Sequence, residues 1–163
     1  MVKILESLDV EPILNELAKL EDSIVWTEYE HKGKQTGLQY KIGDDPFTSA
    51  VGRRQDGDYL YKEINPLFLG TIFESLIVKF NCTRSRLMWV NGMSCYSMHR
   101  DETCRIQIPL ITNPECFFLF KTAPPQHLSV GNVYFIDTRK MHTFINCSDF
   151  PRLHFVGCTT NFF

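Results

Sequence analysis

Two segments of the chain carry apolar residues at the spacing of one helix face. Over residues 10–20 the apolar positions are Ile13, Leu14, Leu17 and Leu20. This spacing predicts an amphipathic helix over residues 10–20, with Asp9 as its cap and Pro12 in its first turn. The same period predicts a second helix over residues 65–80, which begins at an Asn-Pro pair.

Short strand-like runs separated by turns make up most of the remaining chain. Residues 24–30 alternate as a strand, and the turn-rich residues 31–58 predict strands and loops without defined limits. Seven further strands are predicted over residues 84–90, 95–99, 103–111, 116–120, 132–137, 142–147 and 152–158. Many short strands behind two helices predict a mainly β fold with flanking α-helices, either a β-sandwich or a jelly roll.

The composition is that of one ordinary globular domain. The chain has 163 residues, a hydrophobic content of 44% and a formal net charge of −2. We therefore expect a single domain over residues 1–163, and no nucleic-acid partner, because such partners favour a basic surplus. No apolar run approaches the roughly 18 residues of a membrane span, and the start lacks the apolar run of a signal peptide. A cytoplasmic protein without a membrane partner is expected.

Six cysteines are present, and no two are spaced as C-x-x-C. A zinc ribbon or a thioredoxin-like motif is therefore not indicated. Several lie in apolar strand-like runs, where free cysteine packs as a small hydrophobe. We predict reduced, buried thiols for all of them: Cys82, Cys95, Cys104, Cys116, Cys147 and Cys158.

The first candidate for chemistry is the segment around residues 98–107. In a strand, residues two apart share a face, so His99 and Asp101 can reach one point together. By the same parity Arg105 and Gln107 share that face. The opposite face is apolar and consists of Cys104, Ile106, Ile108 and Leu110. A polar face of this kind normally lies in solvent, and this segment alone would favour that interpretation.

A second segment favours a functional interpretation of these polar residues over a solvent-exposed face. His142 begins a predicted strand, and Arg152 begins another one ten positions later. Together with His99 and Asp101, His142 supplies the 2-His-1-carboxylate set of non-haem Fe(II) oxygenases, which leaves one side of the metal open for co-substrate and O₂. A guanidinium such as that of Arg152 can bind the far carboxylate of a dicarboxylate with two parallel hydrogen bonds.

From residue 84 to residue 155 the chain resembles the aspartyl/asparaginyl β-hydroxylase-like branch of the 2-oxoglutarate- and Fe(II)-dependent oxygenases. The matching features are Ser85-Arg86-Leu87, His99-x-Asp101, Cys104-Arg105, Pro109-Leu110, Thr112-Asn113, Gly131, Asp137, His142 and Arg152-Leu153. Some members have Gly in place of Asp101, whereas this chain has the complete triad. Some also carry a second Arg where this chain has Gln107, and its absence speaks against an acidic peptide substrate.

The resemblance implies a double-stranded β-helix, a cupin-like jelly roll, with a helical and mixed support over residues 1–83 and a catalytic core over residues 84–163. It implies that His99, Asp101 and His142 are catalytic and bind Fe(II), and that Arg152 holds the C5 carboxylate of the co-substrate 2-oxoglutarate. Arg105 is expected to bind the C1 carboxylate or the substrate, or else to lie at a sheet edge.

The activity that the resemblance implies is that of an O₂-dependent dioxygenase. Its expected partner is an amino acid or an Asp, Asn or Pro side chain of a peptide or protein, hydroxylated with release of succinate and CO₂. The alternatives are a nucleobase-demethylating oxygenase and a non-catalytic jelly-roll binding module. A nucleobase substrate would fit a basic rim of Arg84, Arg86, Arg100, Arg139 and Lys140. The oligomeric state is left open.

The remaining candidates have plainer interpretations beside the functional ones. His154 shares the parity of Arg152, and a hydrogen-bonding role behind the site is favoured. His31 and His127 lie in predicted turns and are expected at the surface. Three residues are expected either to approach the pocket or to pack in the sheet: Arg86, Trp89 and Tyr96.

Overall fold

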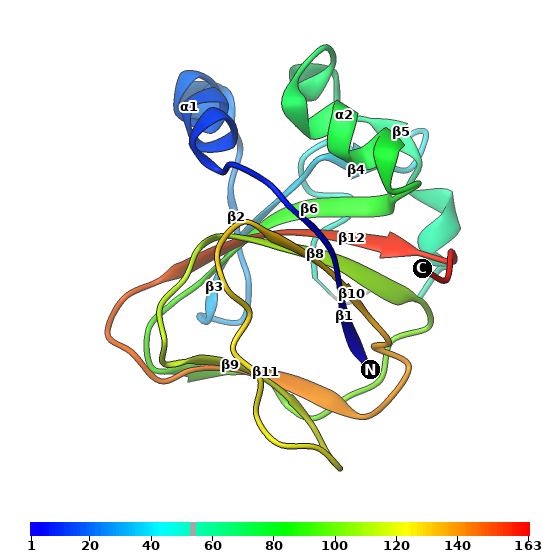
Figure 1. Ribbon diagram of the computed structural model, residues 1–163. Helices are drawn as coiled ribbons and strands as arrows, with labels where there is room; N and C mark the ends of the chain where they lie inside the picture. The colour runs from blue at the N-terminus through cyan, green and yellow to red at the C-terminus, as the bar shows by residue number, and fades with distance from the viewer. Residues whose placement is uncertain (53–54) are drawn as a thin grey trace.

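A computed structural model describes residues 1–52 and 55–163 of the chain. Its largest element is a seven-stranded antiparallel sheet in the order β1-β10-β8-β12-β6-β3-β2, and a three-stranded sheet in the order β7-β11-β9 lies opposite (Figure 1). The large sheet consists of β1 (Val2–Ser7), β2 (Thr27–Glu28), β3 (Gly33–Gly37), β6 (Thr83–Val90), β8 (Cys104–Ile111), β10 (Asn132–Ile136) and β12 (Arg152–Thr159). The small one consists of β7 (Ser94–Cys95), β9 (Cys116–Phe120) and β11 (His142–Asn146).

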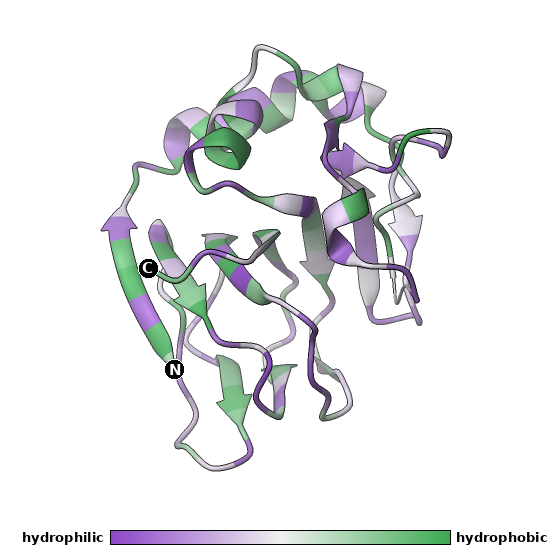
Figure 2. Ribbon diagram, turned by 90° about the vertical axis from the view of Figure 1, so that its right-hand side faces the viewer, coloured by the Kyte–Doolittle hydropathy of each residue, from purple (hydrophilic) through white to green (hydrophobic). Residues whose placement is uncertain are grey.

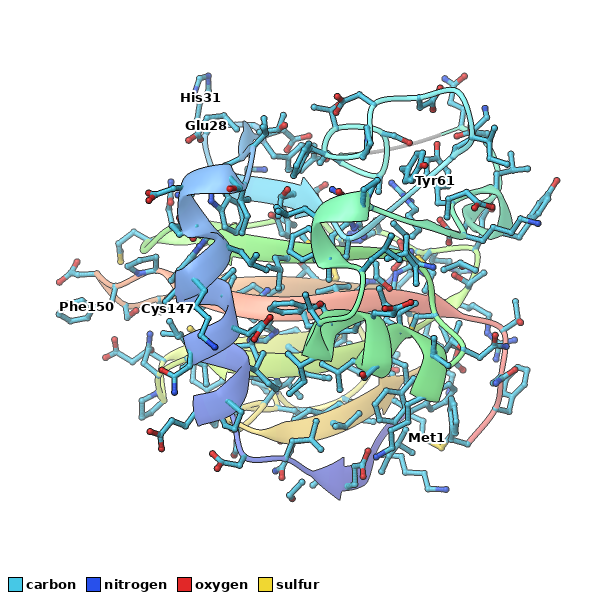
Figure 3. All side chains as sticks on the ribbon, turned by 90° about the horizontal axis from the view of Figure 1, so that it is seen from above. Met1, Glu28, His31, Tyr61, Cys147 and Phe150 are labelled. Carbon is cyan, nitrogen blue, oxygen red and sulfur yellow. The ribbon has the colours of Figure 1, made fainter. Side chains whose placement is uncertain are left out.

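Two helices cover the outer face of the large sheet. They are α1 (Glu11–Leu20) and α2 (Ile72–Lys79), and seen from above both lie over the sheet, with α1 running across its strands (Figure 3). A short pair, β4 (Gln39–Tyr40) and β5 (Glu63–Ile64), lies near α2 in Figure 1. Three 3₁₀ turns complete the elements, at Glu21–Ser23, Asp58–Leu60 and Pro66–Phe68. This arrangement is the predicted double-stranded β-helix of the jelly-roll, cupin-like type with flanking helices.

Strand β8 explains why the large sheet is buried on both faces. Seven of its eight residues are buried. Its apolar face contributes to the core beneath the helices, whose members include Ile13, Phe73, Ile106, Ile108 and Phe155. Its other face carries Arg105 and Gln107 into the space between the two sheets. The polar face is therefore not in solvent, because the small sheet covers it, and Figure 2 shows the resulting mixture of polar and apolar residues along the strands.

The strands predicted in the second half agree with the structure within one or two residues, apart from 95–99. There only β7 forms, followed by an isolated bridge between His99 and His142. The first half contributes more strands than its pattern predicts. Residues 2–7, for which no element is predicted, form β1 beside β10, and Gly33–Gly37 forms β3 beside β6. The predicted strand 24–30 is reduced to Thr27–Glu28.

The predicted helix over residues 65–80 is divided in two. A 3₁₀ turn at Pro66–Phe68 is followed by Gly70, which has a φ of +73°, and only then by α2. A positive φ suits glycine and cannot continue a helix. The Thr71 hydroxyl accepts a hydrogen bond from Phe73 N at 3.2 Å and begins α2 as its cap. At the other helix, Asp9 Oδ1 accepts a hydrogen bond from Glu11 N at 3.0 Å.

The cysteines are free thiols, as predicted, but they are not all buried. Four are buried, whereas Cys95 and Cys147 are exposed. Cys95 lies on β7 at the edge of the small sheet, and Cys147 comes directly after β11. Phe144 and Asn146 are buried on one face of β11, and Ile145 between them is less buried. Cys147 follows Asn146 and continues the alternation toward the outer face. Among the described helices, none has the length and apolar character that crossing a membrane requires.

Truncation of Phe155 tests the packing of the helices on the large sheet. Its side chain has no exposed surface and belongs to the core beneath α1 and α2. We expect Phe155→Ala to lower the free energy of unfolding by about 3–5 kcal/mol, because it leaves a cavity in a closed core. Phe150→Ala is the matched control, since Phe150 is 72% exposed, and should change stability by less than about 0.5 kcal/mol. Urea unfolding measures both, and equal effects would contradict this packing.

Candidate metal centre and pocket

The space between the two sheets contains a pocket of about 380 Å³. Its walls come from strands of both sheets and from the segment before β8. Among the lining residues are the five predicted site residues, His99, Asp101, Arg105, His142 and Arg152. The pocket is therefore the place where residues more than 50 positions apart in the sequence come together.

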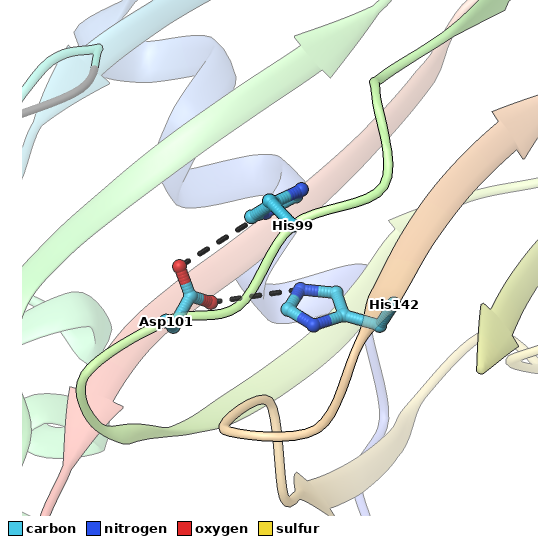
Figure 4. A group of neighbouring side chains, drawn as sticks. All are labelled: His99, Asp101 and His142. Atoms are coloured by element: carbon cyan, nitrogen blue, oxygen red, sulfur yellow. Dashed lines mark ion pairs between the residues drawn. The ribbon is translucent and has the colours of Figure 1, made fainter. Parts of the chain in front are cut away.

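His99, Asp101 and His142 form the only group of potential metal ligands found among the described residues. The ligand atoms lie within 4.8 Å of one another, and Figure 4 shows the three side chains converging. His99 Nε2 lies 4.0 Å from Asp101 Oδ1, and His142 Nε2 lies 3.6 Å from Asp101 Oδ2. The backbones of the two histidines are joined by a pair of N–H···O hydrogen bonds of 2.9 Å each.

Both histidines have the tautomer that a metal ligand needs. His99 Nδ1 donates to Ser97 O at 2.8 Å, and His142 Nδ1 donates to Lys140 O at 2.9 Å. A carbonyl oxygen only accepts, so in neutral rings the protons lie on Nδ1 and the Nε2 lone pairs face the centre. Burial lowers the pKa of His142, which favours its neutral form. Two imidazoles and a carboxylate fit a divalent iron, with further coordination positions left for other ligands.

The carboxylate of Asp101 is held by a network of buried charges. Arg105 Nη2 lies 3.1 Å from Asp101 Oδ1, and Arg105 Nη1 lies 3.3 Å from Asp58 Oδ2. Asp58 also binds Arg84 Nη1 at 2.9 Å and accepts a hydrogen bond from Thr103 Oγ1 at 2.7 Å. Burial alone would raise the pKa of Asp58, but Arg105, Thr103 and Arg84 together hold it well below its usual range.

Asp58 is the pocket residue that the sequence did not reveal. It lies in a 3₁₀ turn of the turn-rich region, and no motif marks it. Its partners lie 26 and 47 positions away along the chain. An acidic residue after glycine in a loop is ordinarily solvated, so no local signal distinguishes this buried carboxylate from a surface one.

Arg152 is a buried cation without a carboxylate partner in the described part of the chain. It is 3% exposed, and its guanidinium lies over the Phe144 ring, 3.0 Å from the ring centre. Its Nη1 contacts His154 Nδ1, while its Nε has no hydrogen-bond partner. Burial lowers the pKa of Arg152 to about 9. His154 lies against Arg152 and Gln107 instead of lining the pocket.

Three residues were expected either to approach the pocket or to pack in the sheet, and the structure places them in both ways. Arg86 and Tyr96 line the pocket, whereas Trp89 packs against the core beneath the helices. His31 and His127 are exposed, as predicted. Of the five residues of the predicted basic rim, Arg84 and Arg86 are buried, each 7% exposed, whereas Arg100, Arg139 and Lys140 are exposed.

No protein-family model matches the chain, and no curated protein matches it in sequence. Solved structures do resemble it. An oxidoreductase of the 2OG-Fe(II) oxygenase family from Burkholderia pseudomallei superposes with a TM-score of 0.58 at 14% identity, over 96% of this chain and 82% of that one. At this identity the likeness shows a shared fold.

Two further structures are more distant. One is Rhodobacter sphaeroides SigE in complex with the anti-sigma ChrR, with a TM-score of 0.48 and 11% identity over 91% of this chain; the match spans 56% of that chain. The other is a cupin domain from Bordetella pertussis Tohama I, with a TM-score of 0.40 and 16% identity over 45% of this chain and 77% of that one.

Replacement of Asp58 tests the charge network. Asp58→Asn leaves Arg84 and Arg105 without their shared counter-ion, so we expect a loss of about 3–5 kcal/mol in the free energy of unfolding at pH 7. The folded-state pKa of Asp58 is depressed. Its contribution is therefore complete above the unfolded pKa of about 4 and is lost as the pH falls below it.

Urea unfolding between pH 7 and pH 3 measures this contribution. The difference between the two proteins should be constant above about pH 5 and shrink below about pH 4. Asp22→Asn is the control, because Asp22 is exposed in the 3₁₀ turn Glu21–Ser23 and its replacement should change stability by less than about 0.5 kcal/mol. A difference that does not depend on pH would contradict the assigned role of Asp58.

Proposed function

We propose that this protein is an Fe(II)- and 2-oxoglutarate-dependent dioxygenase. The proposed reaction is hydroxylation of an amino acid, or of an Asp, Asn or Pro side chain of a peptide or protein. The observation that carries the proposal is the convergence of His99, Asp101 and His142 in a pocket, with both Nε2 atoms available. The fold shared with a member of the 2OG-Fe(II) oxygenase family supports it.

The three ligand side chains would hold Fe(II) from one side and leave its other side toward the pocket. Bound there, the iron supplies the coupling of O₂-dependent 2-oxoglutarate decarboxylation, which yields succinate and CO₂, to hydroxylation of the substrate. The chain's own part is to fix the ligands. The Nδ1 hydrogen bonds orient both imidazoles, and Arg105 orients the Asp101 carboxylate.

Arg152 is the residue that we assign to the C5 carboxylate of 2-oxoglutarate. A buried guanidinium without an anionic partner is costly, and a carboxylate ligand would remove that cost. Phe144 and His154 fix the side chain before the ligand arrives. Arg105 has two carboxylate partners already, so its contacts favour the positioning of Asp101, and a direct role toward the co-substrate stays a prediction.

The apolar part of the pocket lies close to the ligands. The Phe118 ring stacks on His142 with centroids 5.2 Å apart and an angle of 10° between the planes. Phe144, two positions after His142 on β11, lines the same pocket. These rings limit the access of water to one side of the metal centre, which protects an oxidising site from side reactions.

The alternative of a nucleobase substrate has weaker support. Of its five rim residues, Arg84 is buried and paired with Asp58, and Arg86 is buried as well, whereas Arg100, Arg139 and Lys140 are exposed. A small amino acid or a single side chain fits a pocket of about 380 Å³. Iron-dependent turnover distinguishes the proposed enzyme from the alternative of a non-catalytic jelly-roll module.

Removal of a metal ligand should abolish turnover without unfolding the protein. We expect His99→Ala and Asp101→Ala to reduce iron-dependent succinate release from 2-oxoglutarate by at least about a hundredfold, consistent with loss of a direct ligand. His127→Ala, at an exposed histidine outside the pocket, is the control and should retain full turnover. Circular dichroism checks folding. Unchanged turnover in both ligand variants would refute the proposed function.

A conservative change at Arg152 tests the co-substrate subsite. Arg152→Lys keeps the charge but loses the planar pair of donors, so we expect the KM for 2-oxoglutarate to rise roughly tenfold while kcat changes less. Arg139→Lys is the control. Arg139 is half-exposed and does not line the pocket, so its replacement should leave this KM unaltered. The measurement is succinate release at varied 2-oxoglutarate. An unaltered KM in Arg152→Lys would contradict the anchoring role.

A further inference from the structure

We propose that Arg86 forms a second anion subsite in the pocket, which binds a carboxylate group of the primary substrate. This inference rests on the proposed function and deepens it, because it names the class of substrate. In this assignment Arg152 binds a carboxylate of the co-substrate, and Arg86 binds a carboxylate of the substrate. Both guanidinium groups line the same pocket.

Arg86 is buried without a counter-ion in the described part of the chain. It is 7% exposed, and its Nη1 donates to the Ala50 carbonyl oxygen at 3.2 Å. Its Nε is buried and has no hydrogen-bond partner. Buried charged groups are normally paired, and an unmet donor inside a protein costs free energy. Burial lowers the pKa of Arg86 to about 10, which reflects the same lack of compensation.

Among the buried arginines of the pocket, only Arg86 and Arg152 lack a carboxylate partner in the described part of the chain. Arg84, two residues earlier on β6, is paired with Asp58, and Arg105 on β8 is paired with both Asp58 and Asp101. Two carboxylates therefore serve two of the four buried guanidinium groups that line the pocket. With the C5 carboxylate of 2-oxoglutarate assigned to Arg152, Arg86 is the one of these four buried guanidinium groups that is left for a further carboxylate.

The two unpaired arginines lie at different levels of the sheet. In the pairing of β12 with β6, Arg152 faces Val90 and Val156 faces Arg86. Four residues along a strand correspond to about 13 Å of backbone. Val156 also faces Gln107 on β8, and Arg105 comes two positions before it. Arg86 is thus attached nearer than Arg152 to the end of the sheet where β8 begins, and Asp101 lies in the segment just before that strand.

The free part of the Arg86 guanidinium suits a carboxylate. With Nη1 committed to Ala50, the edge that carries Nε is left for a ligand, and a planar guanidinium edge binds a carboxylate by two parallel hydrogen bonds. Neutral polar side chains line the same pocket, among them Gln35, Tyr96 and Gln107, beside the acidic side chains of Glu30, Asp56 and Glu102. The neutral groups can add hydrogen bonds to a polar ligand.

Anaerobic calorimetry on the protein loaded with Fe(II) and 2-oxoglutarate tests the inference. The probes are matched pairs: each free amino acid with its α-carboxamide, and acetyl-aspartate amide with acetyl-asparagine amide. We expect at least one carboxylate probe to bind, and its carboxamide partner to bind at least tenfold more weakly. Arg86→Gln should weaken the carboxylate probe tenfold or more and remove the preference, because the charge-assisted pair is lost.

Two further variants complete the design. Arg86→Lys keeps a charge in place and should give an intermediate loss, which distinguishes a lost ligand contact from a folding defect; thermal melting checks the fold. Arg139→Gln removes an arginine outside the pocket and should leave both the affinity and the preference unaltered. The affinity for 2-oxoglutarate, measured in the same titrations, should fall in Arg152→Gln by tenfold or more and in Arg86→Gln by less than twofold.

The outcomes separate this inference from the proposed function. Equal binding of carboxylates and carboxamides, or no binding of any probe, would overturn the substrate subsite while leaving the co-substrate site intact. A loss of 2-oxoglutarate affinity in Arg86→Gln that equals the loss in Arg152→Gln would overturn it as well, because both arginines would then serve the co-substrate. Failure of the unaltered protein to bind Fe(II) and 2-oxoglutarate would instead refute the proposed function.

Discussion

The arrangement of this protein depends on the burial of charged side chains between two β-sheets. Guanidinium groups that point from the large sheet into the space between the sheets are costly to bury without counter-ions, because charges removed from water are otherwise strongly destabilising. Asp58 and Asp101 are the counter-ions of Arg84 and Arg105. The same ion pairs fix the carboxylate that faces the two histidines. Stability and the geometry of the candidate metal centre therefore rest on the same contacts.

The apolar side of the large sheet makes this possible. Its core beneath α1 and α2 contains the aliphatic and aromatic residues of β8 and β12, and it provides the hydrophobic stabilisation that the polar interior lacks. A smaller cluster between the sheets, which includes Phe118, Phe120 and Phe144, closes one side of the pocket. The molecule thus separates an apolar layer that holds the fold from a mixed layer in which ligands can bind.

One local feature could be predicted from the sequence because it depends only on strand parity: the alternation of β8 sets Arg105 apart from Ile106 whatever the rest of the chain does. The strands of the second half were predictable for the same reason. His99 and Asp101 lie before β8 and outside a strand, so strand parity is not what brings their side chains together. The division of the helix at Gly70 was not predictable, because a glycine within an otherwise apolar period does not reveal its backbone angle.

By itself, the sequence determined the type of strands, the polar and apolar faces of β8 and the residue types of the candidate triad. Only the tertiary structure decided which polar face is buried, that residues 2–7 and 33–37 join the large sheet, and that Cys95 and Cys147 are exposed. It also decided that Asp58 serves two arginines while Arg86 and Arg152 have no such partner among the described residues. The physical reason is that periodicity is a property of neighbouring residues, whereas burial and charge compensation depend on contacts between segments distant in the chain.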